Sequence, residues 1–166
     1  MLDMAILGLL RESPKHGYEL HHRLVDMGFW RISFGSVYPA LRRLEKNGDI
    51  AAEKGTGRRK SYSLTEAGLA HFEALLADDG AAMDNSSAFR VRLSLFRYLP
   101  NSARIMFLKR RQAVLEQRIE TIEKALADGH IEDRYMRAEM EHRVDTARSD
   151  IQWLDELIRQ EPAYVG

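Results

Sequence analysis

The stretch SFGSVYPALRRLEKNG, residues 33–48, decides the fold of the N-terminal half of the chain. Val37, Leu41 and Leu44 recur at the spacing of one helix face, so they predict a helix with a buried apolar stripe. At about 100° per residue, the face that projects away from the core carries Pro39, Arg42, Arg43 and Lys46. One short helix therefore combines an apolar face for a core with a basic face suited to an anion.

The bounds of this helix depend on Pro39 and Gly48. Gly48 predicts the C-terminal end, because glycine readily adopts the left-handed conformation that often follows a helix. Pro39 has no N–H group and cannot donate a helical hydrogen bond. This loss has no cost only if Pro39 lies in the first turn, where N–H groups have no helical acceptor. We therefore expect the helix to begin near Ser36, since a start at Ser33 would sacrifice one hydrogen bond.

Other predicted elements flank this helix in a defined order. Two amphipathic helices precede it, one ended by Pro14 and one over about residues 17–26. After it, Ile50–Lys54 and Lys60–Leu64 flank a Gly-x-Gly turn and predict a β-hairpin, and Thr65 is expected to cap a further helix. Three helices followed by a hairpin is the order of a winged helix-turn-helix, whose third helix enters the major groove while the wing lies along the phosphate backbone.

Basic residues gather at both elements that would face DNA. The wing turn concentrates Lys54, Arg58, Arg59 and Lys60 around two glycines. Backbone amides and cations can approach phosphate closely there, and arginines on the helix can bind guanine bidentately. Ser36 and Tyr38, near the helix start, are candidates to donate to phosphate or to base edges. The pattern favours sequence-specific binding of double-stranded DNA.

Beyond about residue 80 the sequence predicts helix throughout. Two long helices, over about residues 101–128 and 131–160, carry heptad-spaced apolar residues and predict a coiled-coil-like hairpin. The members of the two seams are Leu108, Leu115, Ile119, Ile122, Leu126, Val144, Ile151, Leu154 and Ile158. Because each seam is too long for the small N-terminal domain to cover, we expect a homodimer, which suits a palindromic operator.

The expected fold class is therefore mainly α with a small β-hairpin. A winged helix-turn-helix domain, residues 1–80, precedes a C-terminal helical dimerisation domain, residues 81–166. Lys+Arg and Asp+Glu both number 25, but the charge separates along the chain. Residues 31–62 and 90–118 are basic, whereas residues 119–166 are acidic, so a neutral chain can still present a positive face.

The composition excludes several other classes of protein. The 166 residues contain no cysteine, which excludes disulfide frameworks, thiol catalysis and thiolate metal sites. The six histidines have no ligand spacing, and no nucleophile elbow or phosphate-cradling glycine motif occurs, so we expect no metal, no cofactor and no enzyme activity. The N-terminus lacks a secretory signal, and no uncharged stretch approaches the roughly 20 residues of a membrane span. We therefore expect a soluble, cytoplasmic protein without a membrane partner.

Four motifs of the N-terminal half occur in order and with characteristic spacing: ILGLL at 6–10, HGYEL at 16–20, SFGSVYPAL at 33–41 and RKSYSLTEAG at 59–68. On these motifs, residues 1–70 resemble the PadR-like family of bacterial transcriptional regulators. This sequence differs from the usual pattern of the family at Asp49, where the family usually has an apolar residue.

The resemblance implies a winged-helix repressor that dimerises through its C-terminal helices. Members of the family often respond to phenolic or other hydrophobic small molecules, or to stress. Carried over by position, Tyr38 and Pro39 lie on the recognition helix, while Lys60 and Tyr62 belong to the wing.

Two alternatives stay open. Phe89, Phe96 and Trp153 are candidates for lining an effector cavity, and plain packing in a core or an interface explains the same residues. The second function class is a protein–protein interaction module, in which the winged helix binds protein and the coiled coil directs assembly. Basic residues on both helix and wing favour DNA, because a protein-binding winged helix has no need of cations at both elements.

Overall fold

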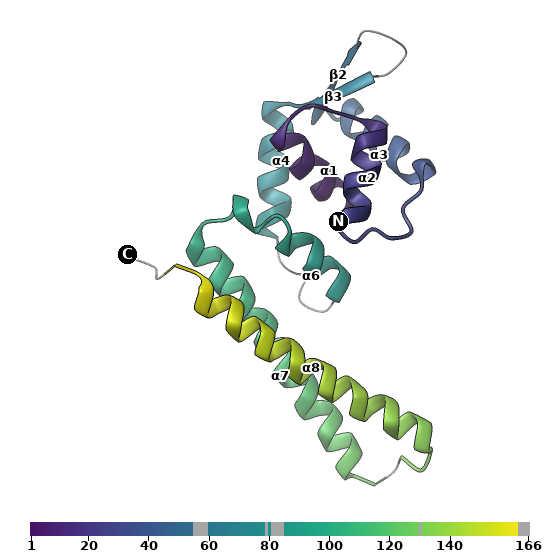
Figure 1. Ribbon diagram of the computed structural model, residues 1–166, viewed down its shortest axis with the longest axis vertical. Coiled ribbons are helices and arrows are strands. Elements are labelled where there is room, and N and C mark those ends of the chain that lie inside the picture. Colours follow the sequence, from purple (N-terminus) through teal and green to yellow (C-terminus); the bar gives the residue numbers. More distant parts are fainter. Residues whose placement is uncertain (55–59, 79, 81–84, 130, 163–166) are drawn as a thin grey trace. The chain divides into compact units, whose positions relative to one another are not determined.

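The computed structural model describes residues 1–54, 60–78, 80, 85–129 and 131–162 (Figure 1). The chain divides into two compact units, Met1–Tyr98 and Leu99–Gly166, and each is described by itself. Within the described ranges, no helix combines the length and the apolar composition that crossing a membrane requires.

The first unit is a helical domain with a small antiparallel sheet. Its elements are α1 (Leu2–Glu12), β1 (Lys15–His16), α2 (Gly17–Asp26), α3 (Phe34–Lys46), β2 (Ile50–Lys54), β3 (Lys60–Leu64), α4 (Glu66–Ala77), α6 (Ser86–Leu93) and the short 3₁₀ helix η1 (Phe96–Tyr98). Both strands of the predicted hairpin are confirmed, and the side chain of Thr65 caps α4 by accepting a hydrogen bond from the N–H of Gly68. Strand β1, which pairs with β3 in the order β1-β3-β2, is too short for its alternation to be detected in the sequence.

Helix α3 begins at Phe34, so the expected start near Ser36 is wrong. Ser33 precedes the helix in an extended conformation, and its carbonyl accepts hydrogen bonds from the N–H groups of Ser36 and Val37 at 2.9 and 3.1 Å. Pro39 therefore lies inside the helix, where the hydrogen bond that a residue normally donates is absent. The fully buried apolar face of α3 outweighs that loss, since one hydrogen bond contributes only about 0.5–1.5 kcal/mol.

Polar contacts around Asp49 hold the root of the wing. Asp49 is buried, and its Oδ2 lies 3.0 Å from Nδ1 of His71 on α4. Its carbonyl accepts hydrogen bonds from the N–H and the hydroxyl of Thr65, at 3.1 and 2.9 Å. A carboxylate is tolerated in this buried position because His71 satisfies it.

Gly68 packs directly against this wing root. An added Cβ would lie 1.9 Å from the carbonyl oxygen of Asp49 and 2.7 Å from its carbonyl carbon. Because backbone atoms cannot move aside cheaply, we expect Gly68→Ala to lower the free energy of unfolding by about 3 kcal/mol, measured by urea denaturation.

Gly35→Ala in α3 is the matched control for that substitution. Its Cβ would meet only the Ser33 hydroxyl, at 3.4 Å, so the free energy of unfolding should be unchanged or raised, since alanine favours helix over glycine. Equal stability of the two alanine variants would contradict the packing of Gly68 on Asp49.

The first unit extends to Tyr98, which corrects the expected boundary at residue 80. Arg92 on α6 is buried and donates to three backbone carbonyls at the C-terminal end of α4. Gly8 on α1 leaves room for Leu95, because a Cβ at Gly8 would lie 2.6 Å from Leu95 Cδ2. The segment after residue 80 is therefore part of the N-terminal core.

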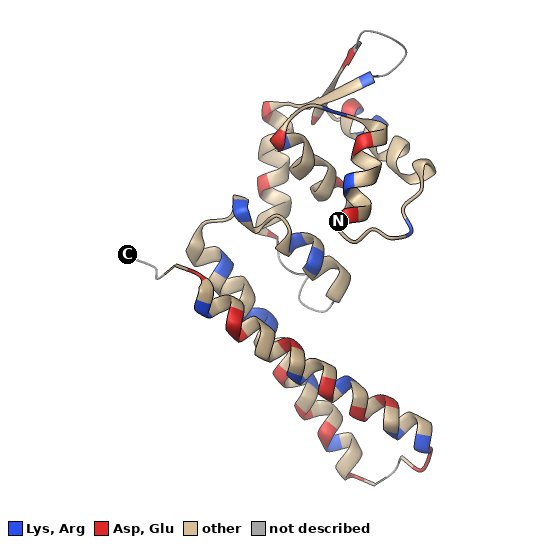
Figure 2. Ribbon diagram, viewed as in Figure 1, with Lys and Arg blue, Asp and Glu red and all other residues tan. Residues whose placement is uncertain are grey.

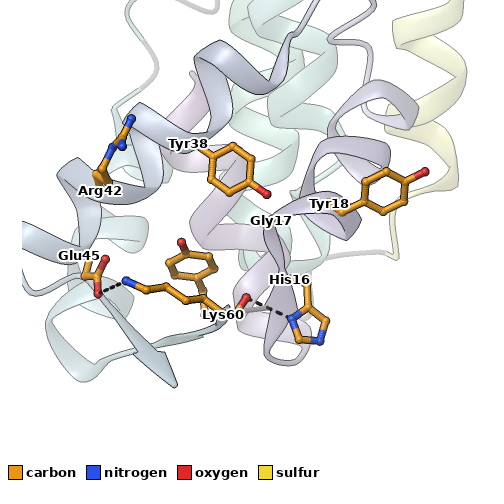
Figure 3. A pocket seen from close by; sticks show the side chains of 8 residues that line it. His16, Gly17, Tyr18, Tyr38, Arg42, Glu45 and Lys60 are labelled. Atoms are coloured by element: carbon orange, nitrogen blue, oxygen red, sulfur yellow. Dashed lines mark hydrogen bonds and ion pairs between the residues drawn. The ribbon is translucent and has the colours of Figure 1, made fainter. Parts of the chain in front are cut away.

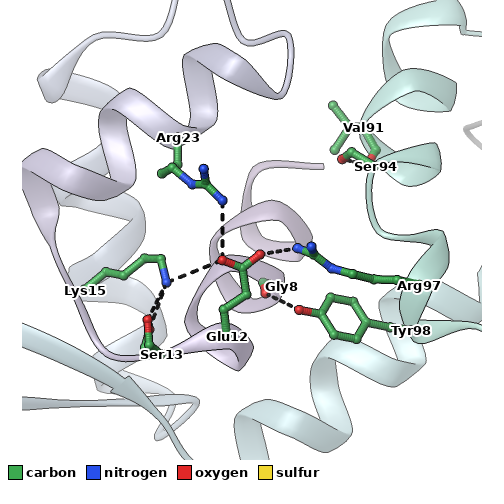
Figure 4. A network of polar contacts seen from close by, with 9 residues as sticks. All are labelled: Gly8, Glu12, Ser13, Lys15, Arg23, Val91, Ser94, Arg97 and Tyr98. Atoms are coloured by element: carbon green, nitrogen blue, oxygen red, sulfur yellow. Dashed lines mark hydrogen bonds and ion pairs between the residues drawn. The ribbon is translucent and has the colours of Figure 1, made fainter.

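Glu12, the last residue of α1, joins several segments of the first unit (Figure 4). Its carboxylate contacts Arg23 on α2 at 3.5 Å, Lys15 at 3.6 Å and Arg97 in η1. Lys15 is buried, and its Nζ also donates to the hydroxyl of Ser13 at 2.8 Å. These contacts hold α1, β1, α2 and η1 in one domain.

The second unit is the predicted helical hairpin, formed by α7 (Asn101–Ala127) and α8 (Arg134–Gln160). Gly129, which follows α7, has a φ of 72°, the left-handed conformation that glycine favours. At the opposite ends of the helices, Arg104 pairs with Glu161 at 2.8 Å. Charged residues of both signs are distributed along both helices (Figure 2).

The hairpin buries much of its own apolar seam within one chain, and burial of the rest by a partner chain stays a prediction. Five of the predicted dimerisation residues are buried within one chain: Leu108, Leu115, Ile122, Val144 and Leu154. Four are half-buried: Ile119, Leu126, Ile151 and Ile158. Exposed large apolar side chains of this unit are Met106, Tyr135, Met136 and Trp153. An argument for dimerisation therefore rests on this exposed set and on the half-buried seam residues.

Candidate nucleic-acid interface

A cleft of about 510 Å³ opens between the start of α2, helix α3 and strand β3 of the wing (Figure 3). Its lining consists of His16, Gly17, Tyr18, Tyr38, Arg42, Glu45, Lys60 and Tyr62. The two elements that were predicted to bind DNA therefore meet at one surface. Four predicted contact residues share this cleft: Tyr38, Arg42, Lys60 and Tyr62.

Tyr38 lies against the N-terminal end of α2. A Cβ at Gly17 would lie 2.9 Å from Tyr38 Cε1, so glycine permits the close approach of the ring. Tyr38 nevertheless keeps 42% of its surface exposed. Ser36 and Pro39 are also exposed on α3, and the Ser36 hydroxyl lies 3.3 Å from that of Ser33.

Tyr62 differs from the other predicted contact residues because it is only 5% exposed. Burial and the nearby carboxylate of Glu45 raise the pKa of its phenol, so the hydroxyl stays protonated at neutral pH. With so little surface, Tyr62 acts first as a packing residue that orients the wing toward α3.

The cations of α3 fall into two groups. Arg42 and Lys46 are exposed and form no ion pair with any residue that the structure describes. Arg43 instead extends to α1, where its guanidinium lies 2.6 Å from Asp3 Oδ1. The sequence predicts equal roles for Arg42 and Arg43, whereas the structure separates them, because only Arg43 has an acidic partner there.

The cations of the wing are described in part. Lys60 is exposed, and its Nζ lies 3.8 Å from Glu45 Oε1, which brings the wing and α3 together. Lys54 pairs with Lys60 in the strand register, and its backbone alone is described. The predicted contacts Arg58 and Arg59 lie outside the described residues.

Several residues at this surface are absent from the sequence prediction, among them Tyr18, Phe34 and Glu45. Tyr18 and Glu45 line the cleft, and Phe34 stacks on Tyr18 with ring centroids 5.9 Å apart. One sequence signal was available, because Phe34 and Tyr38 are four residues apart and therefore share a helix face. The proximity of Tyr18 to that face depends on how α2 packs on α3.

The candidate effector residues belong to both units. Phe89 and Phe96 are buried in the first unit, and Trp153 on α8 is 43% exposed. The effector pocket therefore stays a prediction. Among the described residues, no group of three or more His, Asp or Glu side chains is placed to hold a metal ion.

The sequence matches the model of the transcriptional regulator PadR-like family over residues 6–74. This segment contains most of α1, all of α2, α3 and the wing, and most of α4. The N-terminal segment, residues 6–74, therefore belongs to the PadR-like family of transcriptional regulators.

Three curated relatives match the N-terminal half. The negative transcriptional regulator PadR of Bacillus subtilis is 35% identical over 74 residues, which are 41% of this chain and 41% of that protein. An uncharacterised protein of Lysinibacillus sphaericus is 31% identical over 83 residues, or 46% of this chain and 76% of the relative. An uncharacterised 37.1 kDa transposon protein of Streptomyces fradiae is 33% identical over 66 residues, and the match spans 40% of this chain and 19% of that protein.

Two solved structures align with most of the chain at low sequence identity and with TM-scores below 0.5. Bacillus subtilis PadR in complex with operator DNA has 17% sequence identity and a TM-score of 0.42, with 97% of this chain and 99% of that chain covered. A PadR-like regulator from Bacillus cereus has 18% identity and a TM-score of 0.40, with 96% and 97% covered.

Proposed function

We propose that the protein is a homodimeric regulator that binds double-stranded DNA sequence-specifically, with α3 in the major groove and the wing along the phosphate backbone. One observation carries the proposal: Arg42 from α3 and Lys60 from β3 line the same exposed cleft. An arginine on the exposed face of a recognition helix reaches base edges or phosphate, and a wing lysine reaches phosphate. Exposed Ser36, Tyr38, Pro39 and Lys46 extend this surface along α3.

We assign dimerisation to α7 and α8. Their exposed apolar side chains are a surface that a second copy would cover. Residues 90–118 are basic and residues 119–166 acidic, which gives two copies complementary charge. A two-fold dimer presents two α3 helices to a palindromic operator, with half-sites about 34–36 Å apart or a multiple of that distance.

The proposed role is repression of nearby genes, relieved by a hydrophobic small molecule or by stress, with no catalytic activity and no cofactor. Phe89, Phe96 and Trp153 remain the proposed effector contacts. Bacterial DNA lies in the cytoplasm, and the proposal places the protein there.

The alternative, a protein-binding module, is disfavoured by one feature of the cleft. Arg42 and Lys46 are exposed without an ionic partner among the described residues, and an acidic protein surface or DNA would satisfy them. Basic residues on both elements favour DNA, since Lys60 of the wing lines the same cleft as Arg42 of α3.

Selection of bound duplexes from a random pool by the full-length protein tests the proposal. We expect one palindromic sequence to bind at least 10³-fold more tightly than unrelated DNA, roughly the lower end for specific regulators. Absence of any bound duplex, or binding that ignores sequence, would favour the interaction module.

Lys60→Ala should weaken binding to all duplexes alike. Each lost phosphate contact lowers the slope of log affinity against log salt by about one, so a dimer should lose about two. Gel shifts at several salt concentrations measure this slope. The matched control is Lys124→Ala, which removes an exposed lysine that pairs with Glu120 on α7, and its slope should equal that of the wild type. An unchanged slope for Lys60→Ala would mean that the wing does not lie on the backbone.

A further inference from the structure

Aromatic rings form a row across the start of α2 and α3. The ring of Phe34 stacks on that of Tyr18, with centroids 5.9 Å apart, and on that of Tyr38, with centroids 6.2 Å apart. Phe34 also stacks on the ring of His21, with centroids 4.1 Å apart. The ring of Tyr18 meets that of His22 edge to face, with centroids 4.5 Å apart. We refer to Tyr18, Phe34 and Tyr38 as the aromatic row.

The aromatic row is exposed although it is stacked. Phe34 keeps 40% of its surface exposed, Tyr38 42% and Tyr18 59%. Phe34 is the first residue of α3, and Tyr38 and Arg42 follow it at intervals of four residues. Phe34, Tyr38 and Arg42 therefore lie on one face of α3, and Arg42 lines the cleft.

Position and chemistry limit what this surface can contact. The N-terminal residues of a recognition helix are those that reach base edges in the major groove. Phe34 has no polar side-chain atom, so it can neither donate to a phosphate nor accept from a base. The apolar group that the major groove presents is the C5-methyl of thymine, which phenylalanine can contact. A methylated cytosine carries a methyl group at the same ring position.

We propose that the aromatic row, with Phe34 at its centre, recognises C5-methyl groups of pyrimidines in the major groove and so helps to determine the operator sequence. The inference rests on the proposed DNA-binding function and adds a specificity-determining group to it. Arg42 would supply the polar contact next along the helix, and Phe34 the apolar one.

Replacing thymine by deoxyuridine tests the inference, because it removes the methyl group and leaves the hydrogen-bonding edge unchanged. The probe is the duplex selected by the full-length protein, resynthesised with deoxyuridine in each half-site, and affinity is measured by fluorescence anisotropy at fixed salt. We expect the wild type to lose about fourfold in affinity for each contacted methyl. Phe34→Ala should bind the two duplexes with equal affinity.

Two further variants separate recognition from packing. Phe34→His keeps a flat ring to stack on His21 but gives it a polar edge, so it should fold and still lose the preference for the methylated duplex. Trp30→Ala removes another exposed aromatic residue, one that lies between α2 and α3 outside the row, and should keep the full preference.

A third duplex, with 5-methylcytosine in place of cytosine, identifies the source of the methyl group. Tighter binding by the wild type but not by Phe34→Ala would support recognition of methylated cytosine. Indifference of the wild type to both modifications, or an equal loss in the wild type and in both Phe34 variants, would overturn the inference. A selected duplex bound without regard to methyl groups would leave the proposed DNA-binding function intact, whereas failure to select any duplex would refute that function itself.

Discussion

Arg42→Ala is expected to lower the affinity for the selected operator by roughly 5- to 150-fold for each half-site, which corresponds to about 1–3 kcal/mol for each good base contact. The loss follows from geometry, because Arg42 lies on the exposed face of α3, lines the cleft and has no acidic partner among the described residues. Its guanidinium is therefore available to DNA. Fluorescence anisotropy with the operator and with an unrelated duplex measures both the affinity and the specificity ratio.

Arg43→Ala is the matched control on the same helix. The Arg43 guanidinium already pairs with Asp3, so its removal should change operator affinity far less than removal of Arg42. An exposed ion pair contributes only about 0–1 kcal/mol, so the protein should stay folded. An Arg43→Ala loss as large as that of Arg42→Ala would show that the pair with Asp3 opens on DNA. Wild-type affinity in the Arg42 variant would exclude α3 as the recognition helix.

Removal of the second unit is expected to have the largest effect. A fragment that ends at Tyr98 keeps the complete first unit, including the α6 contacts with α4, but lacks both helices to which dimerisation is assigned. It should be a monomer that binds single half-sites. Linked binding sites commonly gain about 10²- to 10⁴-fold in affinity, and the fragment should lose a factor in that range on the full operator.

Light scattering and gel shifts measure these two consequences, with circular dichroism as the check on folding. A second fragment, ended at residue 80, is the matched control. It lacks Arg92 and Leu95, which contact α4 and α1, and should be markedly less stable than the fragment that ends at Tyr98. Full-length protein that is monomeric at micromolar concentration, or a Tyr98 fragment that binds as tightly as the whole chain, would contradict the dimer.

Much of the secondary structure could be predicted because its causes are local. The spacing of Val37, Leu41 and Leu44 predicts a helix face, and all three side chains are buried in α3. The glycines that flank the wing turn predict a hairpin, and the strands Ile50–Lys54 and Lys60–Leu64 are present. Local rules failed at Pro39, where a rule about one hydrogen bond was outweighed by burial of the whole helix face.

The sequence predicted which elements form the candidate site, but it did not predict which of their side chains pair with one another. Basic residues on the helix and the wing are visible in the sequence, yet the partner of Arg43 is forty residues away on α1. The aromatic row could not be predicted either, because Tyr18 contacts Phe34 only once α2 has packed on α3.

By itself, the sequence determined where helices and strands form, which face of each is apolar and where cations gather, since these depend on neighbours within a few positions along the chain. Only the tertiary structure decided that Tyr62 is buried, that Asp49 meets His71 and how much of the α7 seam is buried within one chain. It also decided that Arg42 stays exposed while Arg43 is paired. The physical reason is that burial and ion pairing depend on which distant segments come within a few ångströms, and periodicity along the chain carries no record of those distances.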